Sequence, residues 1–102
     1  MKKIILFVMP SCDKCIDIKR FLDEKNIPYK LFNIAAIEGM DEFRKLYPKI
    51  KDRIKHNPDK SVEIPVVLFF DESNALLNTA NSLEEVKRIV EHLSLLELTK
   101  GE

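Results

Sequence analysis

Hydrophobic residues along this chain occur in short blocks that switch between two spacings. Residues 4–8 are an unbroken apolar run, which is typical of a strand buried on both faces of a central sheet. From Asp13 to about Lys25 the apolar residues recur at helical spacing, and Pro28 stops a helix from continuing. The pattern therefore predicts a strand, a short turn and a helix.

The middle of the chain repeats this order. Residues 29–34 predict a second strand, and apolar residues at helical spacing predict a helix from about Met40 to Ile54. Pro48 lies inside that helical pattern, and a proline either kinks a helix or begins one. We therefore expect two helical pieces or one bent helix in this region.

The next segment predicts a β-hairpin. Residues 62–70 are a third strand candidate, with Pro65 near its start. The polar residues 71–74 form a turn between apolar runs, so residues 75–77 should pair back as a short strand.

Ser82 and Glu85 have the spacing of a capping box, which supplies hydrogen-bond partners to the free N–H groups at a helix start. Apolar residues at helical spacing then run to about Leu98, which predicts a final helix. The full order is strand, helix, strand, helix, strand, strand, helix. Alternating strands and helices give parallel strands with right-handed crossovers. The order therefore predicts an α/β fold with a four-stranded mixed sheet and helices on both faces.

Length and charge limit the range of functions. A chain of 102 residues supports one domain, residues 1–102, with a single core. The 17 Lys and Arg residues balance the 17 Asp and Glu residues, so charge gives no reason to expect a nucleic acid or a membrane as partner. We expect a monomer.

The N-terminal segment loosely resembles a signal peptide, with Cys12 in the place of a lipid-modified cysteine. Its apolar run, residues 4–9, is six residues long, which is below the roughly 7–15 residues of a signal core. Removing it would also delete the first predicted strand. We therefore expect this segment to belong to the mature protein, in a reducing cytoplasm.

The only two cysteines stand in the sequence Cys12-Asp13-Lys14-Cys15, directly after the first predicted strand. Thiols at positions i and i+3 share one helical face and can close a disulfide with little backbone movement. The first thiol also lies where a helix N-terminus favours negative charge, so its thiolate, the attacking species, is stabilised. In a reducing compartment such a pair is more often catalytic, redox-sensing or metal-binding than structural.

Two other interpretations of these cysteines stay open. The two cysteines could form half of a zinc site, which needs two more ligands. The only histidines are His56 and His92, far along the chain, and we expect them near helix C-termini rather than as zinc ligands. Alternatively they are inert core residues, which is unusual for a CxxC pair at a strand–helix junction. We expect no bound metal.

The chain resembles the glutaredoxins of the thioredoxin-like superfamily in three features: the motif Cys12-x-x-Cys15, the pair Ile64-Pro65 and the stretch 27–34. Together with the predicted order of elements, the resemblance covers nearly the whole chain. The longer middle segment, residues 40–61, is similar to a branch described as glutaredoxin-related. The resemblance implies that Pro65 follows a cis peptide bond and faces the cysteine pair. It also implies that the backbone of Ile64 pairs with glutathione or with an extended protein segment.

Three positions depart from the usual glutaredoxin pattern. Met9 stands where a basic residue is common, and Asp13-Lys14 replaces a Pro-Tyr pair. Residues 77–81 lack the Gly-Gly pair that precedes the last helix. The backbone N–H groups of Ser82 and Leu83 could still bind a carboxylate there.

As a hypothesis, Cys12 is the nucleophile and Cys15 the resolving thiol. Lys14 should stabilise the Cys12 thiolate and Asp13 should oppose it, so we expect a thiol pKa moderately below about 8.5. Cys12 attacks a substrate disulfide, and Cys15 then attacks Cys12 and releases the reduced substrate.

The sequence therefore predicts a glutaredoxin-like thiol–disulfide oxidoreductase that reduces protein disulfides or glutathione mixed disulfides. We expect no bound cofactor. The electron donor is then either glutathione, as a possible co-substrate, or a protein dithiol. Two alternatives remain: a non-enzymatic module that binds a partner or carries a metal or iron–sulfur cluster, and an arsenate-reductase-like redox regulator.

Overall fold

The computed structural model describes the backbone of residues 3–100 and the side chains of residues 3–93. Its elements follow the predicted order: β1 (Lys3–Val8), α1 (Asp13–Glu24), β2 (Lys30–Asn33), α2 (Ile37–Ile50), β3 (Val66–Phe70), β4 (Leu76–Ala80) and α3 (Leu83–Lys100). The predicted α/β fold class is confirmed.

The four strands form one mixed sheet in the order β2-β1-β3-β4. β1 pairs in parallel with β2, with Leu6 opposite Leu31. On its other side β1 pairs antiparallel with β3, with Leu6 opposite Val67, and β3 pairs antiparallel with β4. The two central strands are almost wholly buried, which explains why their sequences are unbroken apolar runs.

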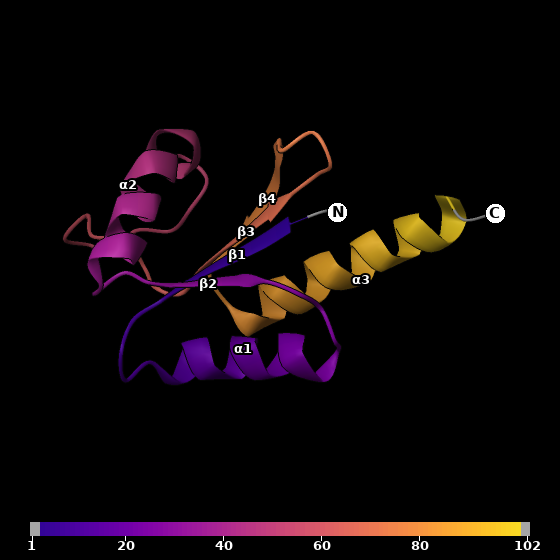
Figure 1. Ribbon diagram of the computed structural model, residues 1–102, viewed down its shortest axis with the longest axis horizontal. Coiled ribbons are helices and arrows are strands. Elements are labelled where there is room, and N and C mark those ends of the chain that lie inside the picture. Colours follow the sequence, from indigo (N-terminus) through magenta and orange to yellow (C-terminus); the bar gives the residue numbers. More distant parts are fainter. Residues whose placement is uncertain (1–2, 101–102) are drawn as a thin grey trace.

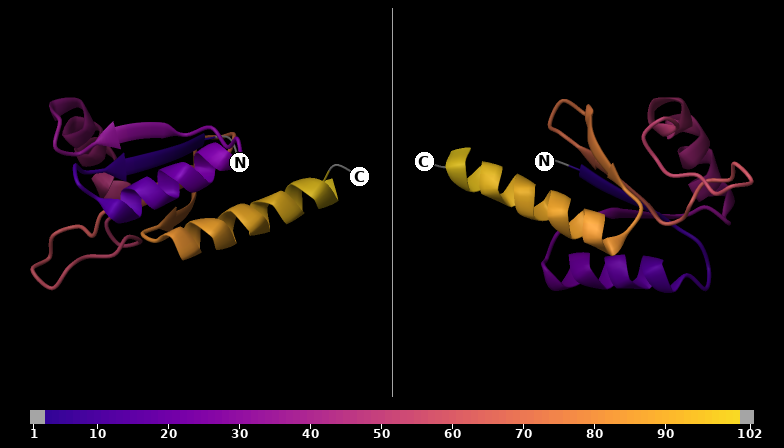
Figure 2. Two further views of the ribbon diagram at one scale, coloured as in Figure 1. Left: turned by 90° about the horizontal axis from the view of Figure 1, so that it is seen from below. Right: turned by 180° about the vertical axis from the view of Figure 1, so that it is seen from behind.

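Helices cover both faces of the sheet, with α1 and α3 on one side and α2 on the other (Figure 1). Side chains of β1 alternate between the two faces. Ile4 and Leu6 join the buried cluster that α1 and α3 complete, whereas Ile5 and Phe7 join the cluster that α2 completes. The C-terminal part of α3 projects beyond the sheet (Figures 1 and 2).

Helix α2 begins three residues earlier than predicted, at Ile37 rather than Met40. Its first turn carries no apolar stripe, because Ile37 is 81% exposed and Gly39 has no side chain. Gly39 is buried where the helix approaches the end of β2 so closely that a Cβ would overlap the backbone oxygen of Asn33. This close approach depends on tertiary packing and left no periodic signal in the sequence.

The end of α2 also differs from the prediction. Of the two alternatives for Pro48 the structure has the single helix, which runs through Pro48 but ends at Ile50 rather than Ile54. The following residues form turns that bring Ile54 back into the core. Ile54 therefore keeps its apolar character without belonging to the helix.

The hairpin is shifted relative to its predicted bounds. β3 starts at Val66, because Val62 pairs with His56 in an isolated bridge instead. β4 covers Leu76–Ala80 rather than residues 75–77. The turn before it is fixed by Asp71, whose carboxylate accepts the backbone N–H of Ala75 at 3.0 Å.

The predicted capping box is present at the start of α3. The Ser82 hydroxyl accepts the backbone N–H of Glu85 at 3.2 Å. The Glu85 carboxylate reaches one residue further back than expected and accepts the backbone N–H of Asn81 at 3.1 Å. Both contacts satisfy donors that the helix itself leaves free.

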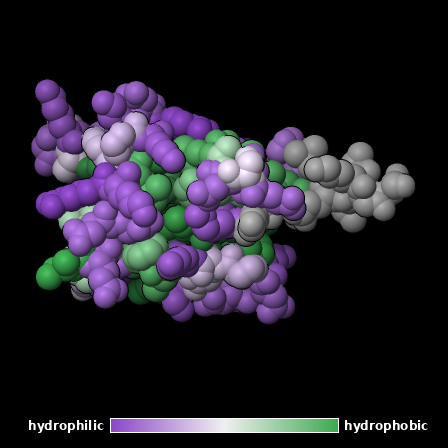
Figure 3. Space-filling model, turned by 45° about the horizontal axis from the view of Figure 1, so that its top comes forward, coloured by the Kyte–Doolittle hydropathy of each residue, from purple (hydrophilic) through white to green (hydrophobic). Residues whose placement is uncertain are grey.

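The surface seen in Figure 3 is mostly hydrophilic, with hydrophobic side chains showing in patches between the charged ones. Among the described helices, none is long and apolar enough to cross a membrane.

Candidate active site

Cys12 lies at the N-cap of α1, directly after the turn that leads out of β1. Ser11 has a positive φ of 58°, which turns the chain sharply before Cys12 returns to an extended conformation. The Cys12 Sγ accepts the backbone N–H of Cys15 at 3.1 Å. The sulfur therefore occupies the position at which a capping side chain satisfies a free donor of the helix.

The two cysteines form a disulfide whose Cα atoms lie 5.3 Å apart. Cys15 is only 4% exposed and shares the buried face of α1 with Ile18 and Leu22. Cys12 is half-buried and open to solvent on one side. The structure thus leaves the first cysteine accessible and buries the second.

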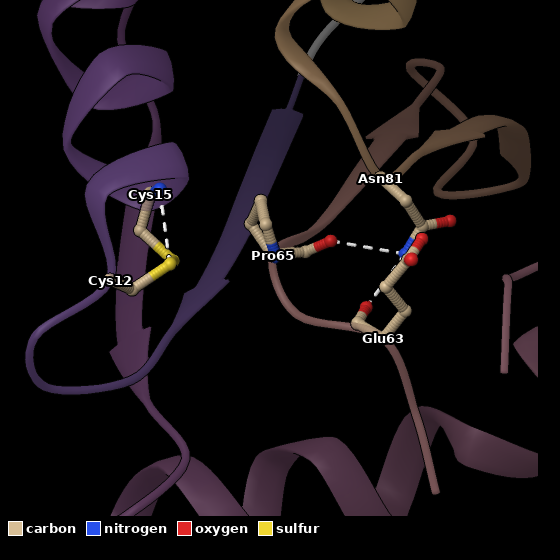
Figure 4. The surroundings of a disulfide bond; sticks show 5 residues. All are labelled: Cys12, Cys15, Glu63, Pro65 and Asn81. Carbon is tan, nitrogen blue, oxygen red and sulfur yellow. Dashed lines mark hydrogen bonds between the residues drawn. A yellow bond between two sulfur atoms is a disulfide. The ribbon is translucent and has the colours of Figure 1, made fainter. Parts of the chain in front are cut away.

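The peptide bond between Ile64 and Pro65 is cis, as the resemblance implied. Pro65 is buried, and its ring lies on the side of the loop that faces the disulfide (Figure 4). The backbone N–H and C=O of Ile64 form no hydrogen bond within the described part of the chain. An extended substrate could therefore pair with this residue beside the cysteines.

A shallow hollow adjoins the cysteine pair on the side of β2. Three large apolar side chains around it are unusually exposed: Met9 at 46%, Ile16 at 50% and Leu31 at 44%. A second apolar groove lies between α2 and the loop before Pro65, and Ile64 forms part of its wall. Apolar hollows beside a cysteine pair are candidate binding regions for a substrate.

Lys19 also borders the hollow beside Cys12, but its charge is already paired. Its ammonium group donates to the Asp23 carboxylate at 3.2 Å, and the Tyr29 hydroxyl donates to the other oxygen of that carboxylate at 2.8 Å. The hydrogen bond that Lys19 donates to Asp23 raises the pKa of Lys19. Lys19 is therefore a cation held by a neighbouring carboxylate.

The other predicted binding residues lie on different sides of the cysteine pair. Lys14 is exposed in the first turn of α1. Ser82 and Leu83 follow Asn81, which Figure 4 shows on the far side of Pro65 from the disulfide. The structure thus brings Ile64 and Pro65 to the cysteines, while substrate contacts at Lys14, Ser82 and Leu83 stay predictions.

Neither histidine lies at a helix C-terminus, contrary to the prediction. His56 is in the loop after α2, where its Nε2 lies 3.1 Å from the Tyr47 hydroxyl, and His92 lies in the body of α3. Within the described part of the chain, no three His, Cys, Asp or Glu residues are grouped as metal ligands would be.

Asn81 contributes to the site but was not identified from the sequence. Its side-chain amide donates to the backbone oxygens of Glu63 and Pro65, at 2.9 and 3.0 Å (Figure 4). In the sequence Asn81 is one polar residue among several before a helix cap, so no local pattern distinguishes it. Only the approach of the Pro65 loop gives it partners.

An N-cap cysteine, a disulfide partner three residues later and a cis-proline loop facing the pair define a dithiol protein of thioredoxin-like fold. Two solved structures of the thioredoxin-like protein BC3987, one of them a mutant, share this fold. Each has a TM-score of 0.55 and 19% sequence identity to this chain. The match to the mutant covers 86% of this chain and 99% of the mutant chain. The match to the other structure covers 84% of this chain and 97% of that chain. No curated protein matches the sequence.

The glutaredoxin family model matches residues 4–72, and the chain belongs to the glutaredoxin family. This span includes both cysteines and the Ile64-Pro65 bond. Together with the Cys12–Cys15 disulfide, family membership indicates a redox-active thiol–disulfide oxidoreductase. Glutathione or protein disulfides are the partners of this family in general.

Proposed function

We propose that the protein reduces disulfides through two successive thiol–disulfide exchanges. The Cys12 thiolate attacks one sulfur of the substrate disulfide, and the other sulfur leaves as a thiolate and takes up a proton. Cys15 then loses its proton and attacks the Cys12 sulfur, which releases the second substrate thiol and closes the Cys12–Cys15 disulfide. Two electrons pass from the dithiol to the substrate, and glutathione or a protein dithiol returns them.

The observation that best supports this proposal is the hydrogen bond from the Cys15 N–H to the Cys12 sulfur at 3.1 Å. In the reduced protein the same donor would stabilise a Cys12 thiolate, and the positive end of the α1 dipole would act in the same direction. The exposures support the order of attack. An external disulfide reaches the half-buried Cys12, whereas Cys15, at 4% exposure, is placed to attack only Cys12.

Among substrates, we propose protein disulfides ahead of glutathione mixed disulfides. Glutathione is a small anionic tripeptide, and cations would be needed to hold its carboxylates. Next to Cys12 the chain exposes Met9, Ile16 and Leu31. Of the two nearby lysines, Lys19 is paired with Asp23, which leaves the exposed Lys14 as the cation for charged groups of a substrate. Such a surface favours an extended polypeptide with apolar side chains, whose backbone would pair with Ile64.

The remaining features of the proposal come from the sequence. Lys14 and the N–H groups of Ser82 and Leu83 are proposed contacts for charged groups of a substrate or of glutathione. We propose that the protein works in a reducing cytoplasm, as a monomer and without a bound cofactor.

The decisive experiment is a titration of the Cys12–Cys15 pair in glutathione redox buffers, with mass spectrometry of the trapped species. We expect one two-electron transition, between about −270 and −120 mV as in related dithiol proteins, and little glutathione adduct on Cys12. A large and persistent adduct would show that glutathione is the preferred partner. A pair that stays oxidised across the whole buffer range would exclude redox cycling and favour a structural disulfide.

A further inference from the structure

Asn81 is the buried polar residue of the described chain, with 5% of its surface exposed. It lies between β4 and α3, and all its side-chain hydrogen bonds go to backbone atoms of other segments. Oδ1 accepts the N–H of Lys55 at 3.1 Å, and Nδ2 donates to the oxygens of Glu63 and Pro65. Both N–H groups and the oxygen of this amide therefore have partners, and burying it without them would be costly.

The two carbonyl groups that Asn81 holds lie on either side of Ile64. The peptide plane that contains the Glu63 oxygen also contains the Ile64 N–H, which points in the opposite direction. Holding the Glu63 carbonyl therefore fixes the direction of the Ile64 N–H. That N–H forms no hydrogen bond within the described part of the chain and is the donor available to a substrate.

The backbone of Asn81 ties the same loop to the first turn of α3. Its N–H donates to Glu85 Oε1 at 3.1 Å, and the same oxygen accepts the Ser82 hydroxyl at 3.1 Å and the Lys55 ammonium at 3.3 Å. Figure 4 shows the resulting order in space, with Pro65 between the cysteine pair and Asn81. The loop that faces the disulfide is thus held from behind by Asn81, together with the bond from the Glu63 N–H to the Lys55 oxygen at 3.0 Å.

We propose that Asn81 is a positioning residue for substrate binding, which holds the Glu63–Pro65 backbone so that the Ile64 N–H meets an extended substrate beside Cys12. The inference rests on the proposed function, because it assumes that the substrate pairs with Ile64. Asn81 touches neither the reacting sulfurs nor the substrate. Its loss should weaken substrate binding and leave the intrinsic reactivity of Cys12 unchanged.

The test variant is Asn81→Asp, which has nearly the same shape and keeps the acceptor for Lys55. Its carboxylate cannot donate, and it would oppose the carbonyl oxygens of Glu63 and Pro65. The matched control is Thr79→Val, since the Thr79 hydroxyl donates to the Arg53 oxygen at 2.9 Å. That bond also joins β4 to the segment after α2 but does not touch the Pro65 loop.

The experiment measures insulin reduction with dithiothreitol as electron donor, alkylation of Cys12 by iodoacetamide, and the NMR shift of the Ile64 amide. For Asn81→Asp we expect KM to rise about tenfold, with kcat and the alkylation rate close to wild type and a displaced Ile64 amide. Thr79→Val should keep the wild-type KM and the wild-type Ile64 shift, even if its melting temperature falls as much as that of Asn81→Asp. If Asn81→Asp does not fold, Asn81→Ser, which can donate one hydrogen bond, should show an intermediate KM and shift.

An unchanged KM and an unchanged Ile64 amide in a folded Asn81 variant would overturn the inference. Equal changes in the Thr79→Val control would overturn it as well, because they would reveal a general stability effect. Failure of the proposed function has a different signature. The wild-type protein would then not reduce insulin, while the Ile64 amide would still move on substitution of Asn81.

Discussion

The sulfur of Cys12 accepts the backbone N–H of Cys15 at the first turn of α1, at a distance of 3.1 Å. One residue thus serves as the cap of a helix and as the accessible half of a disulfide. In the reduced protein the N-terminus of α1 would stabilise a Cys12 thiolate, in the same direction as the predicted effect of Lys14. We therefore expect the backbone of the strand–helix junction to contribute to the reactivity of Cys12.

Replacing the two cysteines one at a time separates their roles. Cys12→Ser should lower disulfide reduction to the uncatalysed background, because no nucleophile then reaches the substrate. Cys15→Ser should still attack but should accumulate a mixed disulfide on Cys12, which mass spectrometry detects as the added mass of the substrate thiol. A Cys12→Ser protein that keeps full activity would contradict the assignment of the nucleophile.

Substituting Met9 tests the preference for protein disulfides. Met9→Lys places a cation beside Cys12, where an opposite charge about 4 Å away contributes roughly 1 kcal/mol in water. We expect kcat/KM for a glutathione mixed disulfide to rise several-fold relative to that for insulin. Met9→Gln is the control, since it removes the apolar contact without adding charge. Equal effects of the two variants on both substrates would argue against an electrostatic preference.

Gly39→Ala should destabilise the protein although alanine is the better helix former by about 1 kcal/mol. The added Cβ would overlap the Asn33 backbone oxygen, so α2 must move away from the end of β2. We expect the free energy of unfolding in urea to fall by about 2–4 kcal/mol. Asp41→Ala, at an exposed position of the same helix, should change it by less than about 0.5 kcal/mol. A stabilised Gly39→Ala protein would show that the two elements are not held this closely.

Tyr29→Phe should lower the stability of the protein by an amount that depends on pH. The hydrogen bond from the Tyr29 hydroxyl, with the Lys19 contact, holds the pKa of Asp23 below its ordinary value. A carboxyl whose pKa is lower in the folded state stabilises the protein above its unfolded pKa of about 4, and this contribution is lost as the pH falls through the folded pKa. The variant should melt slightly below wild type at pH 7 and together with it near pH 2. A constant difference between the two pH values would mean that the effect does not act through Asp23.

The order of elements could be predicted from local patterns because strands and helices leave different periodicities. Residues 4–8 and 66–70 are buried on both faces, and their apolar runs show it directly. The boundaries of α2 could not be predicted in this way. Its first turn is set by the contact of Gly39 with β2, and Ile54 packs in the core after the helix has ended.

In the candidate site too, only the features that depend on neighbouring residues could be predicted from the sequence. Cys12 and Cys15 are three positions apart in the chain, so their spacing places them at the same end of a helix. The chain by itself therefore predicted the disulfide pair and indicated its chemistry. The Ile64-Pro65 bond was predicted by resemblance, since its local sequence is compatible with either isomer.

The sequence alone determined the elements, their order and the dithiol at the head of α1, because each depends on residues a few positions apart. Tertiary structure alone decided what surrounds that dithiol. Pro65 faces the cysteines, as the resemblance implied but no local pattern could show. Asn81 holds the loop, and Leu31 borders the hollow beside Cys12. These contacts join segments distant in the chain. The free energies of these contacts depend on how helices cover the two faces of the sheet. A local sequence pattern carries no information about that arrangement.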